Sequence, residues 1–208
     1  MTLCLQKARK INMEQDNIMD IKLSEEPYQI GVFGSGTVDE KRYQMAYDVG
    51  ASLAKKGHIV ISGGLSGAME ASARGAAEAN GLVIGVMPGI DFEEGNPYST
   101  VKLLTGMRYA RNCINGLSCH GAIVVSGSSG AYEEARRVWE GRGPVVVLAG
   151  SGSETSAPGT MMHLQDIKGM AFPEDKPKPY KIFVAHSPEE AVSIVIEQIK
   201  KGYPKNEY

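Results

Sequence analysis

From residue 28 onward, short apolar runs alternate with longer stretches in which apolar residues recur every three or four positions. The short runs predict seven strands, over Gln29–Phe33, His58–Ile61, Leu82–Met87, Val101–Leu104, Ala122–Ser126, Val145–Ala149 and Lys181–Val184. The longer stretches predict five helices, over Asp39–Lys56, Ala68–Ala79, Arg108–Leu117, Tyr132–Glu140 and Pro188–Lys201. Strands and helices that alternate in this way are typical of α/β proteins.

Two of the predicted strands are apolar at every position. Ala122–Val125 and Val145–Leu148 lack the alternation of a strand with one solvated face, so we expect both faces of the sheet to be covered. Strands of this kind belong to parallel sheets flanked by helices. The predicted fold class is therefore α/β, a Rossmann-like doubly wound parallel sheet in three layers.

The chain divides into a tail and one domain. Residues 1–27 have no sustained period and end at Pro27, which predicts an N-terminal tail. Residues 28–202 are expected to form a single nucleotide-binding Rossmann-like domain. Within it, residues 150–179 are irregular and rich in Ser, Gly and Pro, which leaves two interpretations open: a flap near the site or a mobile excursion.

The composition of the chain limits the classes of partner that we expect it to bind. Of the 208 residues, 22 are Lys or Arg and 24 are Asp or Glu, and a net charge of −2 gives no overall field that attracts nucleic acid or an anionic membrane. We therefore expect a small-molecule partner, with no nucleic acid and no membrane. Three cysteines without metal-ligand spacing, and an N-terminus without an apolar signal core, indicate a cytoplasmic protein. The histidines lack metal spacing too, so neither a metal nor another cofactor is expected.

Three predicted strands end in glycine and serine. Because the carboxyl ends of parallel strands share one edge, these turns should lie together, where helix N-termini offer N–H groups to a phosphate. The alternative is that each turn only joins a strand tightly to a helix. The candidate phosphate-binding residues in these turns are Gly34, Ser35, Gly63, Gly64, Ser66, Gly67, Gly127, Ser128, Ser129, Gly130 and Ala131.

Two common nucleotide-binding motifs do not fit these turns. Asp39 stands where a dinucleotide fingerprint needs its third glycine, and Ser62 stands where a ribose-binding acid would end the second strand. No Gly-Lys-Ser or Gly-Lys-Thr follows any turn, which excludes a P-loop. NAD and P-loop ATP chemistry are therefore disfavoured.

Charged residues lie beside the turns. Glu133 and Glu134 begin a helix and diverge by roughly 100°, so only one can face the ligand. Glu134 is four residues past Gly130, which directs it over the turn, and Glu133 is expected to face solvent. In the segment Met107–Asn112, Arg108 and Arg111 are both candidates for a bidentate phosphate clamp, and the residues alone do not decide between them.

These motifs resemble a known family in order and spacing. Gly63–Glu70, then Arg111–Asn112, then Ser126–Glu134 are similar to the signatures of the Lonely Guy family, often labelled "possible lysine decarboxylase". The resemblance covers roughly residues 29–150. It implies a Rossmann-like core, a homodimer and hydrolysis of nucleoside 5′-monophosphates to free base and ribose 5-phosphate. It also implies that Glu134 and Arg111 are catalytic and that Met107, Arg108 and Asn112 contact the ligand.

The third turn departs from the family pattern. Ser126, Ser128 and Ala131 stand where the family has Pro, Gly and Thr, and Asn112 replaces the Lys of cytokinin-activating members. This looks more like the divergent branch that includes the molybdenum-cofactor carrier proteins. Two functions therefore stay open: a phosphoribohydrolase, and a non-catalytic carrier or sensor of a phosphorylated pterin or nucleotide. A purely structural oligomerisation module ranks last, because it does not explain three such turns.

Lysine decarboxylation is rejected on chemical grounds. Pyridoxal phosphate chemistry needs a Schiff-base lysine at the site, and the glycine-rich turns contain none.

Overall fold

A single parallel sheet forms the centre of the molecule. The computed structural model describes residues 21–141, 143–152 and 182–201. Its seven strands have the order β4-β3-β2-β1-β5-β6-β7, and each neighbouring pair is parallel. Their bounds are β1 Gln29–Phe33, β2 Ile59–Ser62, β3 Val83–Met87, β4 Val101–Leu104, β5 Gly121–Val124, β6 Val145–Leu148 and β7 Ile182–Ala185. The predicted doubly wound fold is confirmed.

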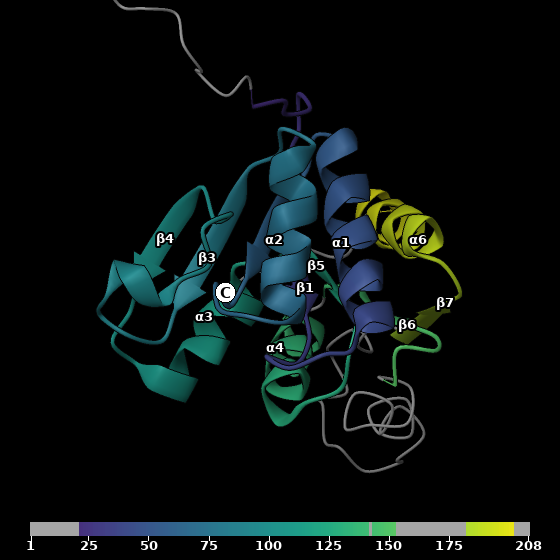
Figure 1. The fold of residues 1–208 in the computed structure, drawn as a ribbon. Coiled ribbons are helices and arrows are strands. Elements are labelled where there is room, and N and C mark those ends of the chain that lie inside the picture. Colours follow the sequence, from purple (N-terminus) through teal and green to yellow (C-terminus); the bar gives the residue numbers. More distant parts are fainter. Residues whose placement is uncertain (1–20, 142, 153–181, 202–208) are drawn as a thin grey trace, which may run out of the picture.

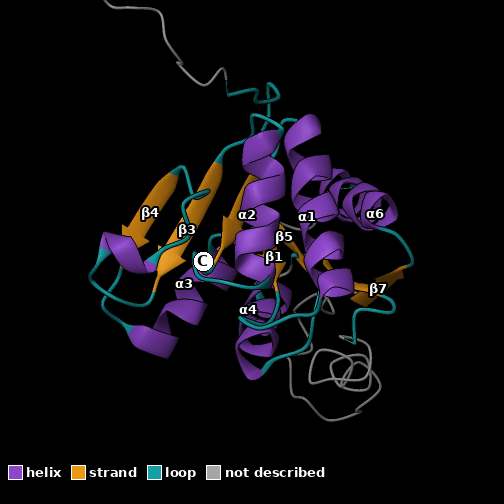
Figure 2. Cartoon of the chain, viewed as in Figure 1, coloured by secondary structure: helices purple, strands orange, loops and turns teal. Residues whose placement is uncertain are grey.

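Helices cover both faces of this sheet and give three layers (Figure 1). They are α1 Glu40–Lys55, α2 Ala68–Glu78, α3 Asn112–Leu117, α4 Ser129–Glu140 and α6 Pro188–Lys200, with short 3-10 helices η2 Phe92–Glu94 and η3 Arg108–Arg111. α1, α2 and α6 pack on one face in the main core, while α3 and α4 pack on the other (Figure 2). The fully buried strands explain the continuous apolar runs, because both faces need apolar side chains.

α1 and α2 approach each other closely through glycine. A Cβ added at Gly50 would lie 2.0 Å from the Ser72 carbonyl oxygen, and one at Gly75 would lie 2.0 Å from that of Tyr47. Since no side chain fits there, the two helices pack backbone to backbone. This contact holds α2, whose N-terminus reaches the carboxyl edge of the sheet.

Two helices differ from their predicted bounds. α4 begins at Ser129, three residues before the predicted start, because the Ser128 hydroxyl accepts a hydrogen bond from the Ala131 N–H (3.1 Å) and caps the helix. The helix predicted over residues 108–117 is split, with 3-10 geometry in η3 followed by α3. The break follows Gly106 and Arg108, which have φ values of +63° and +51°.

Residues 21–27, the described part of the predicted tail, contact the domain: the Lys22 and Ser24 N–H groups donate to the carbonyls of Asn80 and Gly57, each at 3.0 Å. Residues 1–20, and the irregular segment from residue 153 onward, lie outside the described residues.

Candidate functional site

The three glycine and serine turns meet where the strand order reverses. β1 lies between β2 and β5, so the turns that follow these strands share one edge. There the Ser35 N–H donates to the Ser126 hydroxyl (2.6 Å), and the Ser66 hydroxyl donates to the Gly36 carbonyl (3.0 Å). The reversal point of an open α/β sheet is the usual ligand position, and these bonds fix the three turns to one another.

Glycine is required where the first two turns touch. Gly67 has φ +66°, and a Cβ there would lie 2.5 Å from the Ser35 carbonyl oxygen. A Cβ at Gly34 would lie 2.6 Å from both the Ala68 Cβ and the Ser126 Oγ. These positions therefore let the N-terminus of α2 approach the end of β1.

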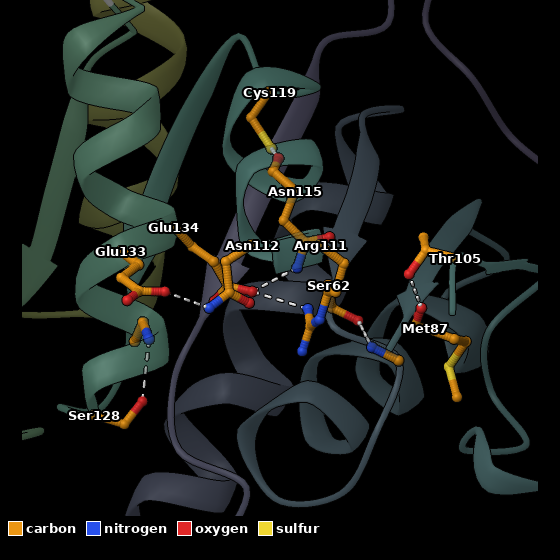
Figure 3. Close-up of polar contacts among 12 residues, drawn as sticks. Ser62, Met87, Thr105, Arg111, Asn112, Asn115, Cys119, Ser128, Glu133 and Glu134 are labelled. Atoms are coloured by element: carbon orange, nitrogen blue, oxygen red, sulfur yellow. Dashed lines mark hydrogen bonds and ion pairs between the residues drawn. The ribbon is translucent and has the colours of Figure 1, made fainter. Parts of the chain in front are cut away.

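Beside these turns, Arg111 and Glu134 form a buried ion pair. Arg111 Nη1 lies 2.9 Å from Glu134 Oε1, and the two residues are 8% and 5% exposed. Asn115 Nδ2 donates to the same carboxylate oxygen, and Figure 3 shows both side chains reaching Glu134 from the α3 side. A Cβ at Gly63 would lie 2.4 Å from Arg111 Nη1, so this glycine makes room for the guanidinium.

The two adjacent glutamates point to different surroundings, as their angular separation predicts. Glu134 lies on the buried side of α4 with Ala131 and Ala135. Glu133 is exposed, and its Oε2 accepts a hydrogen bond from Asn112 Nδ2 (2.9 Å). Glu134 is therefore buried beside the turns, whereas Glu133 lies at the surface against Asn112.

Burial controls the charge of the ion pair. Burial raises the pKa of Glu134 to about 7, although the Arg111 charge and the Asn115 hydrogen bond oppose this change. The same burial lowers the pKa of Arg111, against the attraction of Glu134. At neutral pH the Glu134 carboxyl is thus near its midpoint and can exchange a proton, which is typical of catalytic acids and bases.

Space opens beside the N-terminus of α4. A Cβ at Gly130 would meet only Asn112 Nδ2 at 3.8 Å and Ser128 Oγ at 4.0 Å. A groove of about 420 Å³ runs from here between α4 and the η3–α3 segment. Its lining includes Tyr109, Asn112, Ser129, Glu133 and Arg136. The lining contains Asn112 and Glu133 but neither Arg111 nor Glu134, so the groove adjoins the buried ion pair without including it.

A larger cavity of about 750 Å³ lies elsewhere, lined by Tyr28, Lys56, His58 and Lys200 among others. It contains none of the glycine turns, and we place the site by chemistry rather than by size. His58 accepts a hydrogen bond there from the Tyr28 N–H (3.3 Å), which gives it a structural role.

Some predicted ligand residues are not brought into the ion-pair cluster. Met107 and Arg108 are exposed at the start of η3, so the structure selects Arg111 as the arginine that meets Glu134. Within the described ranges no three His, Cys, Asp or Glu side chains are grouped to hold a metal. None of the helices described has the length and apolar content needed to cross a bilayer.

Sequence reasoning missed Asn115, and it missed the contact that Ser126 makes. Asn115 lies four residues after Arg111, a spacing that places both on one helix face, so this signal was present in the sequence. The contact of Ser126 with Ser35 joins residues 91 positions apart and had no local signal.

The fold and the residues at the carboxyl edge of the sheet together define a Rossmann-like protein with a candidate ligand site at that edge. The model of the SLOG cluster4 family matches residues 27–192, and the chain belongs to this family. The family is part of the SLOG superfamily, to which Lonely Guy proteins are related, so the resemblance is confirmed at that wider level and not for the Lonely Guy family itself. An uncharacterized protein of Archaeoglobus fulgidus is 41% identical over 126 residues, which are 57% of this chain and 83% of that protein.

Solved structures show the same fold. The molybdenum cofactor carrier protein of Chlamydomonas reinhardtii is 26% identical, with a TM-score of 0.67 over 85% of this chain and 100% of that one. The molybdenum cofactor binding protein of Rippkaea orientalis is 24% identical, with a TM-score of 0.70 over 85% and 99%. DNA processing protein A of Helicobacter pylori, described with a single-stranded DNA binding mode, is 15% identical, with a TM-score of 0.59 over 83% and 81%. At this identity it shows the fold alone.

Proposed function

We propose that this protein binds a phosphorylated, nucleotide-like ligand at the carboxyl edge of the sheet and hydrolyses its N-glycosidic bond. The observation that carries the proposal is the buried Glu134 carboxyl, which Arg111 and Asn115 hold beside two glycine-rich helix starts. A buried carboxyl with a pKa near 7 destabilises the folded protein when it ionises, and groups with pKa values perturbed in this way cluster at functional sites.

The N-terminus of α4 is the better phosphate site of the two. At both helix starts two N–H groups have no acceptor among the described residues, those of Met69 and Glu70 in α2 and those of Ser129 and Gly130 in α4. The first turn of α2 contains the acid Glu70, which repels an anion, whereas the first turn of α4 contains no acid. The N–H groups of Ser129 and Gly130 and the helix dipole would hold the phosphate.

Glu134 would act on the sugar. Breaking the bond between C1′ and the base creates an oxocarbenium-like transition state, which a nearby carboxylate stabilises. Oε1 receives the Arg111 and Asn115 donors, whereas no described residue hydrogen-bonds to Oε2, which is left for C1′ or the attacking water. Water supplies hydroxyl to C1′, the base leaves with a proton, and this chemistry needs no metal or cofactor.

A second candidate is a carrier or sensor that binds such a ligand, including a phosphorylated pterin, without consuming it. Two observations favour it: the structural likeness to molybdenum cofactor carrier proteins, and a third turn in which Ser128 caps α4 where the Lonely Guy pattern has glycine. The same phosphate site would serve either function.

We also infer a homodimer or higher homo-oligomer, in a cytoplasmic protein with no nucleic-acid or membrane partner. Large apolar side chains are exposed on the edge strand β4 and nearby, among them Val101, Leu103, Ile90, Phe92 and Tyr109. Exposed apolar groups of this kind mark interaction surfaces. Light scattering after size exclusion gives the oligomeric state, and fluorescence anisotropy with labelled single-stranded DNA tests the absence of nucleic-acid binding.

The decisive experiment incubates the pure protein with nucleoside 5′-monophosphates and follows free base and ribose 5-phosphate by chromatography. Release that is abolished by Glu134→Gln establishes the hydrolase. Glu140→Gln is the matched control, because it makes the same change on the same helix at a residue that pairs with Arg136 and Arg137. If no nucleotide is cleaved but thermal shift still reports binding, the carrier replaces the hydrolase.

A further inference from the structure

Asn115 is fully buried, yet its side-chain amide is only half satisfied. Its Nδ2 donates to Glu134 Oε1, and its backbone carbonyl accepts from the Cys119 thiol (3.0 Å). Its Oδ1 is buried with no hydrogen-bond partner among the described residues. An unsatisfied buried acceptor destabilises the folded state.

Packing alone does not explain an asparagine here. A leucine has a similar shape and would remove the unsatisfied oxygen without leaving another buried polar atom in its place. What leucine cannot supply is the N–H that reaches Glu134. The polar group is therefore explained by the carboxylate that it contacts.

Arg111 and Asn115 act on Glu134 from one face of the η3–α3 segment. They are four residues apart, and both donate to Oε1 rather than one to each oxygen, as Figure 3 shows. Two donors on one oxygen fix the rotation of the carboxyl group. Arg111 Nε is also buried without a partner in the described chain. Arg111 and Asn115 therefore use one donor each on Glu134 and leave other polar atoms unsatisfied, so they do not form a fully hydrogen-bonded network of their own.

We propose that Asn115 is a positioning residue, which holds Glu134 Oε1 together with Arg111 so that Oε2 faces the ligand. This inference rests on the proposed function for its consequence in catalysis. Its physical content, a hydrogen bond from Asn115 to the ionised carboxyl, can be tested without any substrate.

The test is the titration of Glu134 by carbon-13 NMR on protein labelled at glutamate side-chain carboxyls, with Glu134→Gln used to assign the resonance. In Asn115→Leu the ionised carboxyl loses a donor, so we expect its titration midpoint to rise by about one to two pH units. Ile114→Val, on the same helix, changes packing without changing the donor and should leave the midpoint in place.

An unchanged midpoint in a folded Asn115→Leu protein would overturn the proposal. Should that variant not fold, Asn115→Ala removes the same donor with a smaller side chain and adds no charge, and the midpoint must again rise. If wild-type protein cleaves nucleotides, the pH–rate midpoint must move upward with the NMR midpoint, and kcat must fall more than KM rises. If it cleaves none, the proposed function fails while the titration still decides the role of Asn115.

Discussion

Replacing Glu134 with glutamine should change how the stability of the protein depends on pH. The Glu134 pKa is about 7 in the folded protein, against an ordinary value of 4.5. Between these pH values the folded state keeps a proton that the unfolded state has released. The wild-type protein should therefore lose stability as pH rises through this window and show no further loss from this group above it.

The size of the effect follows from the pKa difference. At about 1.4 kcal/mol for each pKa unit, Glu134 lowers the free energy of unfolding by about 3 kcal/mol between pH 4.5 and pH 8. Glu134→Gln has no carboxyl at this position and lacks this contribution. Other titrating groups are common to both proteins and cancel in the difference between them.

Urea unfolding of both proteins at several pH values from 4.5 to 8 measures this difference. We expect the variant to gain about 3 kcal/mol relative to wild type across the range, with most of the change between pH 5 and pH 7. A difference that stays constant with pH would refute the reasoning, because it would mean that burial does not disfavour the ionised carboxyl.

Three further changes test the site. Arg111→Met leaves the Glu134 charge unpaired, so the free energy of unfolding by urea at pH 8 should fall by about 3–5 kcal/mol. The fall should be smaller at pH 5, because the carboxyl is protonated there. An equal fall at both pH values contradicts this reasoning. Gly63→Ala places a Cβ 2.4 Å from Arg111 Nη1 and should displace the guanidinium from Glu134, which raises the titration midpoint of this carboxyl in carbon-13 NMR; an unchanged midpoint would show that Gly63 is not needed for the ion pair. Ser128→Ala removes the α4 cap and should cost about 1 kcal/mol in thermal unfolding, whereas an unchanged melting temperature would mean that the cap contributes nothing.

Much of the fold could be predicted from the sequence, for a local reason. A strand buried on both faces must be apolar throughout, so runs such as Val145–Leu148 identify both the strand and its parallel sheet. Glycine and serine at the ends of β1, β2 and β5 then place three turns at one edge. The position of the proposed acid could also be predicted, because Glu134 lies four residues after Gly130 near the start of a helix, a spacing that directs it toward that edge.

Helix boundaries were less predictable where a tertiary contact competes with the local pattern. The residues from Arg108 to Leu117 have a helical period, but the Arg108 N–H donates to the Pro88 carbonyl (3.0 Å) and the first turn takes 3-10 geometry. Local periodicity contains no information about that carbonyl.

The sequence by itself therefore determined the sheet class, the shared edge of the turns and which of the two adjacent glutamates lies on the inner side of its helix. Only the tertiary structure decided that Arg111, and not Arg108, meets Glu134, that Asn115 holds the same oxygen, and that Gly63 makes room for the guanidinium. The reason is that these contacts join separate elements, whose relative positions depend on how α3 and α4 pack on the sheet. A periodic pattern describes one element at a time and cannot specify the distance between two.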